Sequence, residues 1–402
     1  MTGSRAAHSG PEYREWRHTQ VSVAGTSYTL VSKPGVFAHG TEDPAAVLLA
    51  ERVKIAEGDV VVHLNCRNGL FGTVAARVAA RVVLTDRNIV AVGAAKRTLA
   101  ANGVTLGEVL LGHGTFPLPP DTQADVVAIR IPQEKLSLLQ LLTDAFRILK
   151  VGGRCYLAGA NNEGAKTAAG MAERMFGNGG VLAVQSGHRV VMATKQREAI
   201  PGDASLASPY LEPGTFNDFQ ATLRGRSYAL STRPGVFSWD HLDEATTILA
   251  DTMEINAGES VLDLGCGGGA LGVVAGALSG QGRICMVDAD VEAVRSATRT
   301  AELGGLINFS ALTSDIAGEV LDQRFEAVVT NPPFHVGKAT DLTVPAQFIR
   351  DAYDVLAPNG RLYLVANRTL PYERQIFQLF DNIATMHDGR RFKVLSATKG
   401  TR

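Results

Sequence analysis

One stretch near the C-terminal end of the chain combines groups that suit a particular kind of ligand: Asn331, Pro332, Pro333 and Phe334. It follows residues 325–330, an apolar and β-branched run that predicts a buried strand. Two prolines cannot continue a sheet ladder, because neither has an N–H group and both fix φ near about −65°. The sequence therefore predicts a stiff loop at the end of this strand, with an amide, prolyl carbonyl groups and an aromatic face. Such a loop suits a planar molecule that carries an amino group.

A second candidate site is a glycine-rich loop that ends one predicted strand and opens a helix. It contains Gly265, Cys266, Gly267 and Gly269, and Asp263 precedes it by two residues. The glycines let the backbone turn sharply and approach a ligand, while the helix N-terminus presents unpaired N–H groups. Taken alone, the loop also fits a dinucleotide-binding protein or a tight turn that binds nothing. The carboxylate favours S-adenosylmethionine (SAM), because it would repel a pyrophosphate but attract the cationic amino group of a methionine moiety.

Two further carboxylates and a histidine are candidates for ligand contacts. Asp288, at the end of the next predicted strand, is placed to bind ribose hydroxyl groups in either class of protein. Asp315 can accept a hydrogen bond from an adenine amino group, or it can cap a helix over 316–321. His335 either orients a substrate base or RNA backbone or has a structural role.

The elements that must position these residues occur twice. Residues 27–37 recur as 227–237, and residues 58–66 recur as 258–266. A repeat of this length indicates duplication of a whole domain rather than a solenoid. In each copy a hairpin and a helix precede strands that alternate with helices, which predicts an α/β fold with a doubly wound, mostly parallel sheet.

The repeat predicts the domain boundaries and the elements of each copy. We expect 1–18 to lack regular structure, and then a first domain (19–195), a linker (196–214) and a second domain (215–402). The strands expected in the second domain are 260–264, 283–287, 307–312, 327–330, 361–366 and a final antiparallel strand 392–397. The helices expected there are 243–254, 270–278, 291–303, 344–356 and 372–380.

The Asp263 loop, Asp288 and the proline loop together resemble the class I SAM-dependent methyltransferases that modify exocyclic or amide nitrogens. Three stretches, 233–238, 331–337 and 365–372, more narrowly resemble the bacterial ribosomal RNA guanine-N2 methyltransferases. The small-subunit (16S) family is the better match, and the large-subunit (23S) family is its sibling. These families have two tandem Rossmann-like methyltransferase domains, so the resemblance covers nearly the whole chain. It implies SAM as cofactor and ribosomal RNA or a ribosomal subunit, 30S before 50S, as partner.

The resemblance also implies roles for individual residues. The Asn331 side-chain oxygen and the Pro332 carbonyl would accept the N–H bonds of guanine N2, and Phe334 would stack on the extracted base. Phe334 can alternatively be a core aromatic residue, and Asn331 can cap a turn. The catalytic residues implied are Asn331, Pro332, Pro333 and Phe334. The cofactor would be bound by Asp263, Gly265, Cys266, Gly267, Gly269, Asp288, Asp315 and Asn331, and the substrate by Phe334, His335, Asn367 and Arg368.

The first copy departs from this pattern. At the key positions of the second copy's glycine loop it has His63, Asn65 and Arg67, and its proline loop is reduced to 130–132. Asp86 is retained. A side chain at position 65 and a guanidinium at position 67 would obstruct the cofactor path, so we expect this domain to bind no SAM. The resemblance implies that it supports the second domain and helps to hold RNA.

Composition restricts the remaining possibilities. The formal net charge is −1 at pH 7, so any contact with RNA must use local basic patches. No apolar run is long enough to cross a membrane, the N-terminus does not resemble a signal peptide, and the four cysteines lack metal-site spacing. We expect a cytoplasmic protein with reduced thiols and no metal. A monomer is compatible with the sequence, which does not determine the oligomeric state.

Two alternatives remain open at this stage. A methyltransferase for adenine or for a protein glutamine would use the same Asn-Pro-Pro-aromatic loop, but the duplication and residues 233–238 favour the ribosomal RNA family. A non-catalytic RNA-binding or ribosome assembly protein would not need an intact Asp263 loop and Asn331 in one copy. The sequence identifies neither the target guanine nor whether the substrate is free RNA or an assembled subunit.

Overall fold

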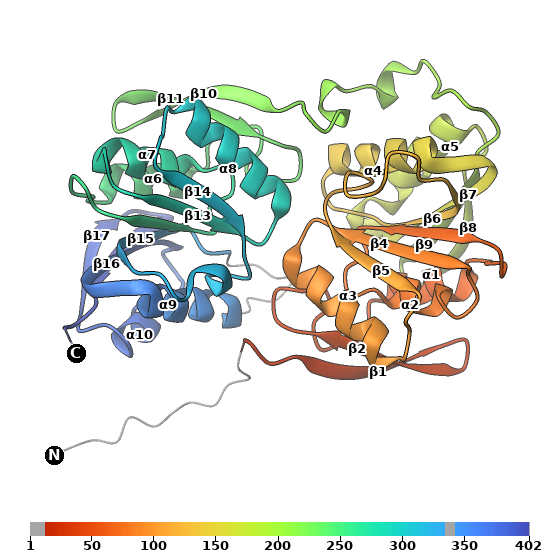
Figure 1. The fold of residues 1–402 in the computed structure, drawn as a ribbon, viewed down its shortest axis with the longest axis horizontal. Coiled ribbons are helices and arrows are strands. Elements are labelled where there is room, and N and C mark those ends of the chain that lie inside the picture. Colours follow the sequence, from red (N-terminus) through yellow and green to blue (C-terminus); the bar gives the residue numbers. More distant parts are fainter. Residues whose placement is uncertain (1–12, 334–341, 402) are drawn as a thin grey trace.

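The structure is a computed structural model, and it describes residues 13–333 and 342–401. Two domains of the same architecture lie side by side (Figure 1). Each contains a seven-stranded sheet covered by helices and a separate two-stranded hairpin. The predicted duplication of an α/β domain with a mostly parallel sheet is confirmed.

The elements of the two domains follow the same order. The first domain contains β1 (Arg17–Val23), β2 (Thr26–Ser32), α1 (Pro44–Arg52), β3 (Val60–Leu64), α2 (Leu70–Ala75), β4 (Arg81–Asp86), α3 (Ile89–Ala101), β5 (Gly107–Leu111), β6 (Ala124–Arg130), α4 (Lys135–Ile148), β7 (Leu149–Ala160), α5 (Ala165–Phe176), β8 (Gly180–Gln185) and β9 (His188–Thr194). The second domain contains β10 (Asn217–Leu223), β11 (Arg226–Thr232), α6 (Glu244–Thr252), β12 (Val261–Leu264), α7 (Ala270–Ser279), β13 (Ile284–Asp288), α8 (Val291–Leu303), β14 (Phe309–Thr313), β15 (Phe325–Thr330), α9 (Thr343–Val355), β16 (Leu356–Asn367), α10 (Tyr372–Phe377), β17 (Asn382–Asp388) and β18 (Phe392–Thr398).

Strand order explains where ligands can bind. The sheets run β5-β4-β3-β6-β7-β9-β8 and β14-β13-β12-β15-β16-β18-β17. The central strands are parallel, whereas β9 and β18 run antiparallel to their neighbours. Between β12 and β15 the chain reverses the direction in which it adds strands, and such switch points are where open α/β sheets bind ligands. The predicted glycine loop and proline loop follow these two strands.

The registers of the two sheets fix which residues correspond. Asp263 pairs with Val329 in the second sheet, and His63 pairs with Ala128 in the first. Counting two residues onward along β15 and β6, Arg130 occupies the place of Asn331. This correspondence connects the two sites described below.

Some predicted elements differ from those observed. Strand β17 was not predicted, because its sequence is largely polar and most of its side chains are exposed, as suits an edge strand paired on one side with β18. The helix expected over 372–380 ends at Phe377, and the strand expected from 307 begins at Phe309.

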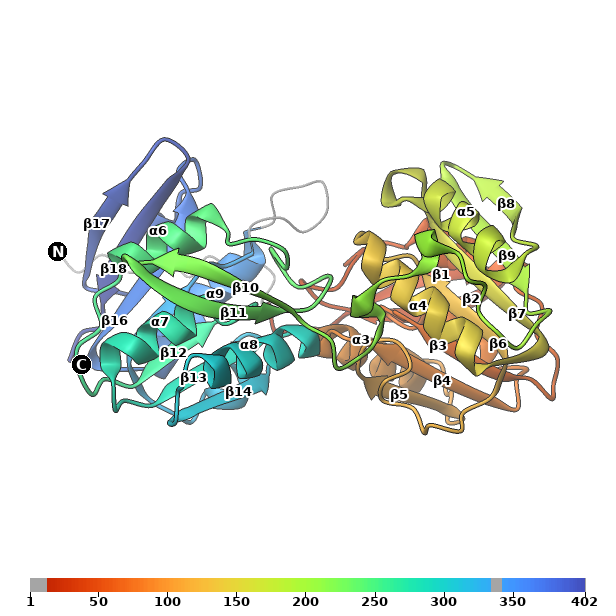
Figure 2. The same ribbon diagram turned by 90° about the horizontal axis from the view of Figure 1, so that it is seen from above.

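The terminal and linking segments are also more structured than expected. Strand β1 begins at Arg17 and Tyr13 is buried, so the expectation of 18 unstructured residues is wrong for the described part of that segment. Residues 196–214 connect the domains (Figure 2) and include two 3-10 turns. Leu206 and Leu211 in these turns pack into the core of the first domain. The linker is therefore attached to that domain over part of its length.

Equivalent loops of the two domains join them. The Ile89 N–H donates to the Ala289 carbonyl and the Val291 N–H donates to the Arg87 carbonyl, each at 2.9 Å. Arg87 also pairs with Asp290 at 2.6 Å. The loops after β4 and β13 thus pair in antiparallel fashion, and the carboxyl edges of both sheets face the junction.

Two features are absent from the described residues. Within 13–333 and 342–401, no helix has the length and apolar character needed to cross a membrane. The same residues contain no cluster of His, Cys, Asp and Glu side chains arranged to hold a metal ion.

Candidate active site

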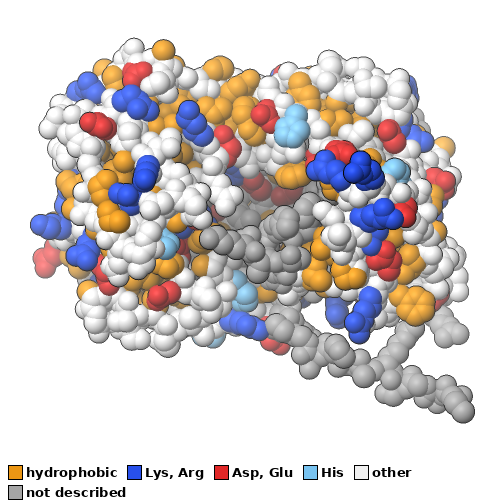
Figure 3. All heavy atoms as spheres, turned by 180° about the vertical axis from the view of Figure 1, so that it is seen from behind, with side chains coloured by type: hydrophobic (Ala, Val, Ile, Leu, Met, Phe, Trp, Pro, Cys, Tyr) orange, Lys and Arg blue, Asp and Glu red, His pale blue; other side chains and the backbone are white. Residues whose placement is uncertain are grey.

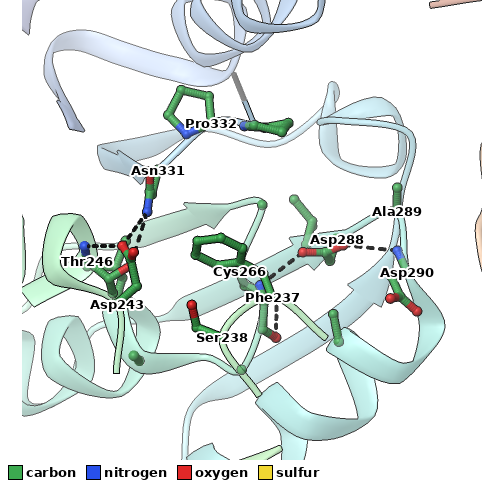
Figure 4. A pocket seen from close by; sticks show the side chains of 18 of the residues that line it. Phe237, Ser238, Asp243, Thr246, Cys266, Asp288, Ala289, Asp290, Asn331 and Pro332 are labelled. Atoms are coloured by element: carbon green, nitrogen blue, oxygen red, sulfur yellow. Dashed lines mark hydrogen bonds between the residues drawn. The ribbon is translucent and has the colours of Figure 1, made fainter. Parts of the chain in front are cut away.

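A cavity of about 640 Å³ lies at the carboxyl edge of the second sheet (Figure 4). This volume is in the range of small-molecule sites, about 300–1,000 Å³. Its lining includes the glycine loop, Asp288 and Asn331, which the sequence predicted as one site. Apolar side chains line the cavity as well: Val287, Ile316, Val344 and Phe348. The first domain closes part of the cavity with Tyr13, Phe37, Asn88, Val90 and Gln133.

The glycine loop keeps backbone close to the cavity. Gly267 has φ +51°, and a Cβ atom there would meet nothing within 4 Å, which leaves room for a ligand. Gly269 has φ +81°, and a Cβ atom there would come within 2.9 Å of the Ala297 Cα. Gly267 thus leaves space for a ligand, whereas Gly269 lets α7 pack on α8.

Asp288 is fixed beside this loop. Its Oδ2 accepts a hydrogen bond from the Gly267 N–H at 2.9 Å, and its Oδ1 accepts one from the Asp290 N–H at 3.0 Å. Burial raises the pKa of Asp288 to about 6. At neutral pH the carboxylate therefore remains an acceptor on the cavity wall, which suits ribose hydroxyl groups.

Asp263 lies behind the loop. Its side chain is 0% exposed and is not part of the cavity wall. Its Oδ2 accepts a hydrogen bond from the Gly272 N–H at 2.8 Å, in the first turn of α7. Burial raises the pKa of Asp263 to about 7. The geometry gives Asp263 a supporting position, and its predicted contact with a methionine amino group stays a prediction.

Asn331 has a fixed amide orientation. Its Nδ2 donates to the Asp243 Oδ2 and to the Thr246 Oγ1, each at 3.1 Å. A carboxylate only accepts hydrogen bonds, so these contacts require the nitrogen on this side and place Oδ1 on the other (Figure 4). The sequence did not identify Asp243 or Thr246, because Asp243 has the features of an ordinary helix N-cap, and it does cap α6.

Phe237 is a second residue of the site whose role the sequence did not specify. It is 63% exposed and lines the cavity together with Ser238. Stretch 233–238 resembles the ribosomal RNA methyltransferases, but this resemblance alone gives Phe237 no role. Arg233, in the same stretch, is buried and pairs with Glu292 at 3.0 Å, so it has a structural role.

Asp315 is engaged by the first domain. Its Oδ1 accepts a hydrogen bond from the Tyr13 hydroxyl at 2.7 Å, and its Oδ2 forms an ion pair with Lys33. The cap predicted for 316–321 is not formed, since this stretch contains only a 3-10 turn at Gly318–Val320. Asp315 does not line the cavity, although its neighbours on both sides do. Its assignment to adenine stays a prediction, with a docking role favoured by these contacts.

The two predicted substrate residues that the structure describes do not lie at the cavity. Asn367 caps its own turn by accepting from the Thr369 N–H, and Arg368 pairs with Asp388 on the surface. Neither lines the cavity. Phe334 and His335 lie outside the described residues.

The first domain has the same positions with different chemistry. Arg130, in the place of Asn331, is buried and pairs with Asp43 at 2.6 Å and with Glu163 at 2.8 Å. Arg67, in the place of Gly267, lies 3.9 Å above the Phe37 ring. Arg67 lines a cavity at this position of the first domain, where the second domain has a glycine. The predicted obstruction of SAM by position 67 stays a prediction.

The residues of the second domain fit SAM. The open space at Gly267, the helix N-terminus, the Asp288 carboxylate and the apolar wall correspond to the amino acid, ribose and base of that cofactor.

Known proteins show the same architecture. The family model described as "Methyltransferase small domain" matches residues 27–192 and again residues 227–396. The ribosomal RNA small subunit methyltransferase C of Hahella chejuensis is 33% identical over 288 residues, which cover 70% of this chain and 80% of that protein. The protein of the same name from Pseudoalteromonas atlantica is 30% identical over 275 residues, 68% of this chain and 77% of the relative.

A solved structure resembles the whole chain. The T. thermophilus 16S rRNA N2 G1207 methyltransferase, in complex with AdoMet and guanosine, has a TM-score of 0.80 and 30% sequence identity. The match covers 95% of this chain and 98% of that one. This chain and the T. thermophilus protein are therefore similar in duplicated fold and in sequence over nearly their whole lengths. The chain belongs to the ribosomal RNA small subunit methyltransferase C family of SAM-dependent enzymes, with two methyltransferase small domains.

Proposed function

We propose that the second domain transfers a methyl group from SAM to the exocyclic N2 nitrogen of a guanine in 16S ribosomal RNA. One observation carries this proposal: Asp243 and Thr246 fix the amide of Asn331 on the wall of the cavity that the glycine loop opens. The names of the relatives, and the guanosine in the T. thermophilus complex, support the substrate class.

The chemistry follows from how the chain can hold the amine. SAM supplies a methyl group on a positively charged sulfur. Guanine N2 is a weak nucleophile, because its lone pair is delocalised into the ring. The Asn331 Oδ1 and the Pro332 carbonyl accept hydrogen bonds from its two N–H groups. These contacts turn the nitrogen toward tetrahedral geometry and localise the lone pair. Such alignment of reactants lowers the activation free energy by about 7–11 kcal/mol. No strong general base is needed, because the methylated nitrogen loses a proton readily.

The base must leave its stack to reach this cavity. Phe237 offers an exposed aromatic face on the cavity wall for the extracted guanine. Stacking on an aromatic ring contributes about 1–3 kcal/mol, which offsets much of the unstacking cost of a few kcal/mol. Phe334, predicted for the same task, remains a candidate for the opposite face.

We assign the small ribosomal subunit, or its RNA during assembly, as the partner. The chain acts as a monomer, and it acts in the cytoplasm. Lys and Arg side chains lie on both domains in Figure 3, and several of those on the second domain, on the right, are close to one another. Arg374 and Arg390 are exposed, and neither forms an ion pair with any residue that the structure describes. They are therefore among the basic residues available to phosphates. The first candidate for the target is the guanine that corresponds to the G1207 named for the T. thermophilus relative.

Transfer of labelled methyl groups tests this proposal. Purified protein is incubated with labelled SAM and, separately, with 30S and 50S subunits and with free 16S RNA, all from a strain that lacks the modification. The labelled nucleotide is then identified by mass spectrometry. We expect N2-methylguanosine in 16S RNA. Label in ribosomal protein, on adenine or only in the 50S subunit would contradict the substrate assignment.

A further inference from the structure

The first domain has its own cavity, of about 580 Å³, at the carboxyl edge of its sheet. Its lining includes Asn65, Arg67, Asp86, Arg87 and His113. This is the position that corresponds to the SAM site of the second domain. Arg67 is one of its lining residues, so the domain keeps a cavity at this position although the glycine loop of the second domain has been replaced.

The ribose end of this cavity is retained. Asp86 corresponds to Asp288, and its carboxylate is held in the same way: Oδ2 accepts from the Arg67 N–H at 2.8 Å and Oδ1 accepts from the Asn88 N–H at 2.9 Å. In the second domain the Gly267 and Asp290 N–H groups make the equivalent bonds. Each oxygen of Asp86 can accept a further hydrogen bond from a ribose hydroxyl group.

The opposite end suits a neutral planar base. His113 and Ser137 line it and are 6% and 2% exposed. The His113 Nε2 and the Ser137 Oγ have no hydrogen-bond partner among the described residues. Burial and nearby arginines lower the pKa of His113 to about 3, so its ring is neutral. Leu141 adds an apolar surface to this end.

The remaining part of the lining carries a positive charge, Arg67, where the second domain has the uncharged Gly267. Burial and the nearby Arg130 lower the pKa of Arg67 to about 10, so its guanidinium is still charged at neutral pH. Arg67 forms no ion pair with any carboxylate in the described part of the chain. Arg130 holds Asp43 and Glu163, and backbone N–H groups hold Asp86. An unpaired guanidinium on a cavity wall attracts an anion, whereas the cationic methionine moiety of SAM would be repelled there.

We propose that this cavity binds a nucleoside 5′-monophosphate group, with Arg67 on the phosphate, Asp86 on the ribose hydroxyl groups and the base beside His113 and Leu141. Because Asp86 requires free 2′ and 3′ hydroxyl groups, the ligand is either a free mononucleotide or the 3′-terminal nucleotide of an RNA. An internal nucleotide, whose 3′ oxygen is esterified, does not satisfy this site.

Calorimetry on the full chain tests this site, with saturating S-adenosylhomocysteine present to fill the second domain. AMP and GMP are the probes, and adenosine and 2′-deoxy-AMP are compared with them. We expect a nucleoside monophosphate to bind at least about 10-fold more tightly than adenosine, because a hydrogen bond to a charged group contributes about 1.5–3 kcal/mol. Absence of AMP and GMP binding at millimolar concentrations would overturn the proposal.

Two arginine substitutions make a matched comparison. Arg67 lies over Phe37 at 3.9 Å, and Arg97 lies over Trp16 at 4.2 Å in the same domain but outside the cavity. We expect Arg67→Met to weaken AMP binding about 10- to 100-fold and Arg97→Met to leave it unchanged, with Arg67→Lys intermediate. Thermal unfolding of each variant checks that it is folded. Equal AMP affinity for Arg67→Met and the wild type would refute the role of Arg67.

The source of the nucleotide is decided by competition. A pentaribonucleotide with a free 3′ hydroxyl that displaces AMP identifies an RNA end as a ligand. The same oligonucleotide with a 3′ phosphate should not compete. If neither displaces AMP, a free mononucleotide is the ligand of this site. Equal displacement by both would contradict the contact of Asp86 with the ribose.

Discussion

The two domains share a fold, but their sites differ at one equivalent position with large consequences. In the second domain Asn331 is held by Asp243 and Thr246, and it presents an amide on an open cavity. In the first domain Arg130 takes that place and forms buried ion pairs with Asp43 and Glu163. Both domains use an aspartate at the start of the same helix, once to orient a functional amide and once to neutralise a cation. At this position the same scaffold thus supports either an oriented amide on a cavity wall or a buried network of ion pairs.

Arg130→Met tests the structural side of this comparison and has the largest expected effect on stability. Removal of the guanidinium leaves two buried carboxylates without their partner, so we expect unfolding to require about 3–5 kcal/mol less free energy. Chemical denaturation followed by circular dichroism measures this change. A triple variant that also carries Asp43→Asn and Glu163→Gln should recover most of the loss. No destabilisation by Arg130→Met would show that this network is not important for the fold.

Asn331→Ala tests the catalytic side. Loss of the oriented amide should lower kcat about 100- to 1,000-fold, the cost typical for one preorganised group that acts on the reacting atoms. SAM affinity should change by less than about threefold, because the glycine loop and Asp288 are untouched. Rates of methyl transfer and calorimetry with SAM separate the two effects. A variant that keeps its rate would remove Asn331 from the mechanism.

Thr246→Val tests the orientation of the amide and should act more weakly. It removes one of the two acceptors of the Asn331 Nδ2, while Asp243 remains, so we expect kcat to fall about tenfold, the worth of roughly one hydrogen bond. The KM for SAM should not change. The matched substitution in the same helix is Thr247→Val, whose hydroxyl donates to the Asp243 carbonyl and not to Asn331. Equal effects of the two variants would contradict a specific role for Thr246.

The pH dependence of SAM binding should show the smallest effect. The raised pKa of Asp288, about 6, means that this carboxylate gains a proton as pH falls from 7 to 5. The protonated group loses acceptor capacity for ribose hydroxyls, so affinity should fall severalfold toward pH 5. Asp263, with a pKa of about 7, gains a proton over a similar pH range. The variant Asp288→Asn distinguishes the two carboxyl groups. If the pH profile is the same in Asp288→Asn, the effect does not come from Asp288.

The sequence revealed those parts of the molecule that depend on local pattern. The repeat, the alternation of strands and helices, and the glycine and proline loops all follow from neighbouring residues, and the structure agrees. Asp243 was not identified because an aspartate at a helix N-cap is common, and only the three-dimensional fold brings Asn331 to it. The contacts of Asp315 with the first domain were not foreseen for a related reason, since its partner Tyr13 is 302 residues away. Long-range contacts of this kind leave no local signal.

The measurement that tests the central comparison most directly is the number of SAM molecules bound per chain, determined by calorimetry. The wild type should bind one SAM, in the second domain. Gly267→Arg copies the residue of the first domain at a position where φ is +51°, close to the +54° of Arg67, so the backbone tolerates the change. We expect this variant to be folded and to bind no measurable SAM. Two SAM molecules per wild-type chain, or one in Gly267→Arg, would contradict the assignment of a single active domain.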